Sequence, residues 1–137
     1  VMAGDTASAV ALSDECFSLS SNFVLVIKEA LTGGSVLTDA GEEVVYTCPG
    51  DGQPDTVRFV NTGMTGDSFT YLVTDTNNVI LAILDQDFED FEDYGIGVRR
   101  VWGLAYNGNL TAAVGDTASV VRLADQCFGL SANFVTV

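Results

Sequence analysis

The sequence lacks histidine altogether and is poor in basic residues, proline and tryptophan. Its 137 residues include no His, five Lys and Arg, two Pro and one Trp. Without an imidazole the chain cannot form a His-based triad, an activated thiol–imidazole pair or a His-ligated metal site. We therefore expect no enzyme and no catalytic residues.

Positive charge is the other scarce property, since 19 acidic residues face 5 basic ones and the net charge is −14. Nucleic acids and anionic membrane surfaces are bound through clusters of Lys and Arg, so neither is an expected partner. No apolar run approaches ~20 residues, which argues against membrane insertion. The chain opens without a basic n-region, so we expect no signal peptide in this stretch.

What the chain does contain is a long internal repeat. Residues 4–26 match residues 115–137 at 16 of 23 positions, without a gap and at a constant offset of 111. This period exceeds the ~20–50 residues of solenoid units and suits a small domain of ~100–150 residues. We interpret residues 1–22 as the tail of a preceding repeat, or a strand exchanged with a neighbour, and residues 23–137 as one complete repeat.

Short runs of β-branched and aromatic residues, separated by turns rich in Gly, Asn and Asp, indicate strands along the whole chain. The expected strands are 23–28, 36–37, 43–48, 56–61, 68–74, 79–84, 98–106, 118–123 and 133–137. Single helical turns are open possibilities at 27–31 and 123–127. This spacing predicts an all-β fold, an immunoglobulin-like antiparallel β-sandwich of about 7–9 strands. The aromatic core candidates are Trp102, Phe59, Phe69, Tyr71 and Phe134.

The three cysteines are explained by the repeat. Cys16 and Cys127 are the same position in successive units, so one unit owns Cys48 and Cys127. An even number per unit suits a disulfide, and we expect Cys48–Cys127. The alternatives are Cys16–Cys48, which would staple neighbouring units, and free thiols. Either disulfide implies an oxidising, extracellular setting.

Acidic residues in two turn-rich stretches are candidate calcium ligands. Calcium binds six to eight oxygens from carboxylates, carbonyls and water. The candidate ligands are Asp51 and Asp55 in the first stretch, and Asp85 and Asp87 in the run that continues to Asp93. The alternative is that these residues form turns by bonding to their own backbone. Separately, Asn109 begins an Asn-Leu-Thr pattern that accepts N-linked glycans in suitable hosts.

Five blocks of the chain together carry a family resemblance. They are residues 47–55, 71–81, 90–92, 100–110 and 123–135. In this order they resemble the tandem repeats of giant secreted surface adhesin or filament proteins of gliding and marine Bacteroidota, exported by the type IX route. The resemblance covers residues 22–137. That family often has a cysteine where this chain has Arg99, so its cysteine pairing is not carried over.

The resemblance implies an extracellular structural repeat. It also implies O-glycosylation at Asp-Thr followed by a small apolar residue, a pattern met at Thr6, Thr56 and Thr117. No Gly/Ser- or Pro-rich linker follows residue 26, so little flexibility is expected between units. We expect a rigid spacer module of a filament or cell-surface adhesin whose partners are neighbouring copies. The alternative is a calcium-dependent glycan- or ligand-binding adhesin module.

Overall fold

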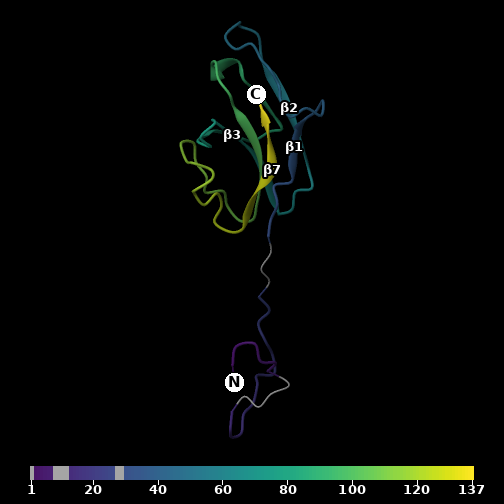
Figure 1. Cartoon of the computed structure of the whole chain (residues 1–137), viewed down its shortest axis with the longest axis vertical. Helices are drawn as coiled ribbons and strands as arrows, with labels where there is room; N and C mark the ends of the chain where they lie inside the picture. The colour runs from purple at the N-terminus through teal and green to yellow at the C-terminus, as the bar shows by residue number, and fades with distance from the viewer. Residues whose placement is uncertain (1, 8–12, 27–29) are drawn as a thin grey trace.

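The computed structural model describes residues 2–7, 13–26 and 30–137 of the chain (Figure 1). Its elements in order are β1 (Ser35–Thr38), β2 (Thr56–Thr62), β3 (Ser68–Thr74), β4 (Ile80–Leu84), β5 (Phe88–Asp90), the 3₁₀ turn η1 (Glu92–Tyr94), β6 (Arg100–Tyr106) and β7 (Phe128–Thr136). The all-β prediction is therefore confirmed, with seven strands in the described part of the chain.

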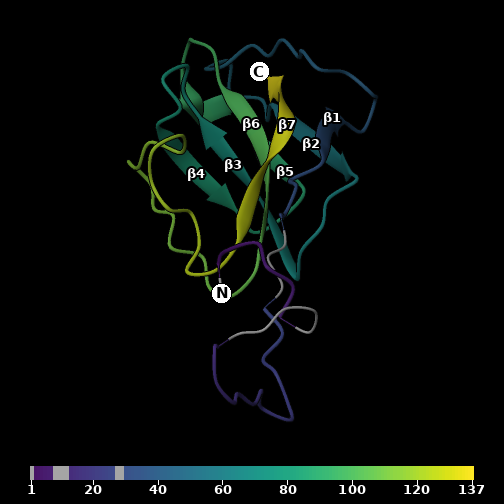
Figure 2. The same cartoon turned by 60° about the horizontal axis from the view of Figure 1, so that its bottom comes forward.

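The strands form two antiparallel sheets that face each other (Figure 2). One sheet has the order β1-β2-β5 and the other the order β4-β3-β6-β7. The architecture is compatible with the expected β-sandwich, and its immunoglobulin-like detail stays a prediction.

The interior between the sheets is filled by alternate residues of facing strands, as the two-residue period of a strand requires. From the smaller sheet come Val36, Val57 and Phe59, and from the larger sheet Tyr71, Val73, Val101 and Val135. The Phe59 and Tyr71 rings lie 5.6 Å apart between centroids. Phe59 and Tyr71 thus belong to the core as expected, whereas Phe69, Trp102 and Phe134 are half-buried.

The outer face of the larger sheet is buried as well, under the long segment 107–127. Leu72, Ile80 and Leu104 pack there against Ala118 and Leu123 of this segment. The same segment follows the free edge of β4, where the N–H groups of Gly115 and Ala118 donate to the carbonyls of Ile80 and Asn78. Because an open strand edge invites pairing with another chain, this cover protects the sheet.

Strand β7 is paired along both edges. One edge forms the antiparallel ladder with β6. The other receives the N–H groups of Gly33 and Val45, which donate to the carbonyls of Leu130 and Thr136. The last strand of the domain therefore fills a slot between β6 and residues 33–45.

Some predicted boundaries differ from the structure. Residues 43–48 form only an isolated bridge at Val44, and residues 118–123 are an irregular cover, so both predicted strands are wrong. Strand β5 was not predicted, because it lies inside an acidic run that resembles a loop. The predicted strand 23–28 is exposed, irregular chain at 23–26, and its remainder lies outside the described residues, as do 27–29 of the possible helical turn. No helical turn forms at 123–127.

Candidate assembly surfaces

The sandwich has two ends, one where the chain enters the domain and one where β7 ends. The N-terminal pole consists of residues 30–34, 63–67, 107–109 and 125–127, and the C-terminal pole of residues 39–55, 91–99 and Val137. Strands β1 and β7 both start at the N-terminal pole, and β7 ends at the C-terminal pole (Figure 1). The chain therefore enters and leaves the domain at opposite ends.

Two polar side chains of β7 hold the strand in its slot by hydrogen bonds. The Asn133 Oδ1 accepts the N–H of Val36 at 2.8 Å, and its Nδ2 donates to the carbonyl of Val36 at 2.8 Å. This residue thereby ties β7 to β1 of the other sheet. The Ser131 Oγ accepts the buried N–H of Gly103 at 2.9 Å and donates to the carbonyl of Asn133 at 2.6 Å.

The apolar residues of β7 complete the fit. Val135 is 0% exposed between the sheets. On the other face the Phe134 ring lies 4.6 Å from Trp102 and 4.7 Å from the Arg100 guanidinium, measured to ring centroids. Trp102 in turn donates its Nε1–H to Thr74 Oγ1. The strand end is therefore held by both packing and cation–π contact.

The N-terminal segment carries the same side chains without a slot around them. At the offset of 111, Phe23 and Val24 correspond to Phe134 and Val135, yet they are 85% and 86% exposed. Every described residue of 2–26 is exposed, and in Figure 1 these residues lie below the sandwich. The first described residue that is not exposed is Leu31, and the repeat boundary at residue 23 stays a prediction.

One local feature of β7 is nevertheless already present in this segment. The Ser20 Oγ donates to the carbonyl of Asn22 at 2.5 Å, which repeats the bond from Ser131 to Asn133. Ser and Asn side chains form such short-range bonds from sequence alone. This local bond therefore forms without a partner strand beside it.

A single difference between the copies affects the slot strongly. Gly129 of β7 crosses residues 31–32 so closely that a Cβ there would lie 2.2 Å from the carbonyl oxygen of Leu31. The corresponding residue of the N-terminal segment is Ser18. That segment therefore cannot replace β7 in this domain unless residues 31–32 shift.

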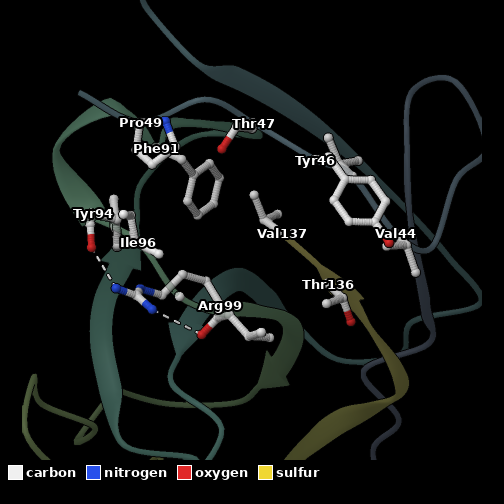
Figure 3. Close-up of a pocket in the computed structure, with 14 residues that line it drawn as sticks. Val44, Tyr46, Thr47, Pro49, Phe91, Tyr94, Ile96, Arg99, Thr136 and Val137 are labelled. Atoms are coloured by element: carbon white, nitrogen blue, oxygen red, sulfur yellow. Dashed lines mark hydrogen bonds between the residues drawn. The ribbon is translucent and has the colours of Figure 1, made fainter. Parts of the chain in front are cut away.

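The C-terminal pole has an apolar pocket of about 440 Å³ beside the end of β7 (Figure 3). In Figure 3 Val137 lies between Phe91, Ile96 and Arg99 on one side and Tyr46 on the other. The Arg99 guanidinium donates to the carbonyls of Tyr94 and Val98. Tyr46 and Ile96 are 93% and 96% exposed, so the rim of the pocket presents large apolar side chains to solvent.

Two tyrosines make the fold sensitive to alkali. Burial raises the pKa of Tyr71 and of Tyr94 to about 12, with smaller contributions from Asp87 and Glu89 respectively. The unfolded chain loses these protons near pH 10, whereas the folded chain keeps them to about pH 12. The stability is therefore complete below pH 10 and falls as the pH rises from 10 to 12.

We expect urea midpoints that are flat from pH 8 to 9.5 and then decrease, with a shallower decrease in Tyr94→Phe. A midpoint that rises or stays constant above pH 10 would contradict these environments for both rings.

The cysteines are placed differently from the expected pairing. Cys16, Cys48 and Cys127 are all exposed free thiols. Cys48 lies in the C-terminal pole, and Cys127 precedes β7 at the N-terminal pole, so the nine residues of β7 separate them. That length is ~30 Å, whereas a disulfide needs Cα atoms within ~7 Å. This corrects the Cys48–Cys127 expectation, and the structure does not form Cys16–Cys48 either.

The acidic candidates serve structural purposes in the described residues. The Glu92 carboxylate accepts the N–H groups of Gly50 and Gly52, and Asp90 accepts that of Asp55. Asp51 accepts the N–H of Gln53 in its own turn. These bonds pin the loop before β2 to the chain after β5.

The second pair of candidates lies elsewhere, where β4 crosses to β5. Asp87 forms an ion pair with Arg58 at 3.0 Å, and Asp85 is exposed. Within residues 2–7, 13–26 and 30–137 no group of three acidic, Cys or His side chains is arranged to hold a metal ion. Calcium binding stays a prediction, and the Asx turns of the alternative are present.

The predicted glycosylation positions differ in accessibility. Thr6 and Thr56 are exposed, whereas Thr117 is half-buried against the edge of β4. Asn109 is exposed, but its Nδ2 donates to Asp125 Oδ2 at 3.0 Å. The same carboxylate accepts the N–H of Asn109, and these bonds lower the pKa of Asp125. Modification at any of the four positions stays a prediction.

Among the described residues, no helix has the length and hydropathy needed to cross a membrane. Comparisons of the chain with protein-family models, with curated proteins and with solved structures found no match.

Sequence reasoning missed the residues that define the β7 slot, namely Ser131, Asn133 and the glycines Gly33, Gly103 and Gly129. A signal for the first two was present, because both copies of the repeat retain Ser-x-Asn-Phe-Val. The glycine contacts join residues 34 to 98 positions apart, so no local pattern indicates them.

Proposed function

We propose that this chain is a structural repeat module of an extracellular filament or large cell-surface adhesin, in which each domain is a rigid spacer packed end to end with the next. The observation that carries the proposal is the second copy of the closing segment. Residues 4–26 repeat the sequence of the closing segment, including its Ser-x-Asn turn and apolar residues, and the described residues among them are all exposed.

The simplest place for this segment is a preceding domain of the same fold in the same polypeptide. Ser18 supports a preceding domain over exchange between identical chains, because a side chain at that position collides with Leu31 of the present slot. The present slot is also filled by its own β7. The extracellular setting is supported by the resemblance to secreted adhesin repeats and by the acidic surface, which keeps copies of the module apart in solution.

The proposal is tested by adding the rest of a domain in front of residues 4–26. In this extended chain, a second copy of residues 27–114 is joined directly before Gly4, and together with residues 4–26 it makes one full period of 111. We expect the amides of residues 17–26 to exchange fast in the chain itself, where these residues are exposed, and to become protected in the extended chain.

Two substitutions sharpen this experiment. Ser18→Gly should relieve the contact with Leu31 of the added copy and raise the exchange protection of residues 17–26. Asn22→Ala should remove the two hydrogen bonds to Val36 of that copy and lower this protection. If residues 17–26 exchange equally fast in the chain and in the extended Ser18→Gly chain, the segment is not a closing strand and the proposal fails.

A further inference from the structure

The joint between two domains of the proposed array is contained in this chain. It runs from Val26, the counterpart of the last residue Val137, to Leu31, which packs at the N-terminal pole near Gly66 and Gly129. Five residues span at most ~18 Å even when fully extended. Two successive domains are therefore tethered pole to pole over less than the length of one domain.

The tether starts inside the apolar pocket of the C-terminal pole. Val137 and Thr136 line that pocket together with Tyr46 and Ile96. The loop that leads into β2 rises beyond the C-terminus (Figure 1). A following domain held within ~18 Å of Val137 therefore meets this loop and the pocket rim.

The exposed apolar side chains around the pocket favour its contact with another domain. Val44, Tyr46, Ile96 and Val98 are exposed, and all four line the pocket around the strand end. Exposed apolar side chains gathered around one pocket of an otherwise acidic domain mark a contact site. The N-terminal pole offers Met64, which is exposed, and Ala30, beside polar backbone of residues 65–67. Methionine adapts its shape to an apolar neighbour.

We propose that the C-terminal pole of each domain is covered by the N-terminal pole of the domain that follows, with Tyr46 and Ile96 inserted against the surface around Met64. This inference rests on the proposed function and names the contact that makes the array stiff. The exposed rim in the present structure is then the half of an interface whose other half is the next domain.

The experiment uses the extended chain in its Ser18→Gly form, in which the added copy precedes the intact domain. Tyr46→Ser and Ile96→Ser are introduced together in the added copy only, where its C-terminal pole faces the next domain. Small-angle scattering should show one stiff elongated body for the extended Ser18→Gly chain, the parent, and a flexible pair of domains for the double variant. The melting temperature should fall by ~5 °C in the extended chain.

Two controls isolate the interface. The same double substitution in the original chain should leave its melting temperature unchanged, because both side chains are exposed there. Val60→Thr in the added copy should change neither stiffness nor melting, because Val60 is 46% exposed in the middle of β2, between the two poles.

The possible outcomes separate the two proposals. If the added copy folds but the parent is as flexible as the double variant, the array stands and the pole-to-pole contact is refuted. If the added copy does not fold even with Ser18→Gly, the proposed function itself fails. A stiff parent that the double variant does not loosen also refutes the role of Tyr46 and Ile96.

Discussion

Replacing Asn133 by alanine should destabilise the domain by about 2–4 kcal/mol, whereas Asn22→Ala should leave its stability unchanged. Asn133 satisfies both backbone groups of Val36, which is 0% exposed. Removing the amide leaves a buried N–H and a buried C=O without partners, at ~1–3 kcal/mol each. It also removes a tie between the two sheets.

The comparison is well matched, because both asparagines stand in the same Ser-x-Asn-Phe-Val sequence. Urea denaturation of the two variants gives the difference in free energy of unfolding directly. Destabilisation by Asn22→Ala but not by Asn133→Ala would mean that the N-terminal segment, and not β7, fills the slot in solution.

Replacing Gly33 by alanine should cost about 3 kcal/mol or prevent folding. A Cβ at Gly33 would lie 2.2 Å from the Ser131 nitrogen, 2.4 Å from the Leu130 carbonyl carbon and 2.6 Å from the Gly103 oxygen. All three are backbone atoms of paired strands, so none can move without breaking the β6–β7 ladder. The chain that enters the domain is therefore pressed directly on its last two strands.

Gly41→Ala is the control for backbone effects alone. Gly41 has a φ of 82° and no atom within 4 Å of the added Cβ, so the substitution costs only the left-handed conformation, about 1 kcal/mol. If Gly33→Ala and Gly41→Ala have equal effects on the urea midpoint, the crossing at Gly33 is looser than the structure indicates.

Much of the fold could be predicted because strand signals are local. β2, β3, β4 and β6 lie where alternating β-branched and aromatic residues indicate them, within two residues at each end. β3 is buried on both faces, so its apolar residues form a continuous run rather than a strict alternation.

Other elements could not be predicted, because long-range contacts decide them. Residues 118–123 have the composition of a strand, but Ala118 and Leu123 cover the outer face of the larger sheet. β5 forms in an acidic run because Phe88 to Asp90 pair with the start of β2. Cys48 and Cys127 looked like partners by count, and only the course of β7 separates them.

The sequence alone determined the period of 111, the equivalence of residues 4–26 and 115–137, and an acidic all-β domain, because identity, charge and strand alternation are written residue by residue. Only the tertiary structure decided what the repeated segment does. It made one copy a doubly paired closing strand and left the other outside the sandwich. The reason is physical: a strand is stabilised by its neighbours, and the partners that β7 finds in β6, Gly33 and Val36 are distant in the chain.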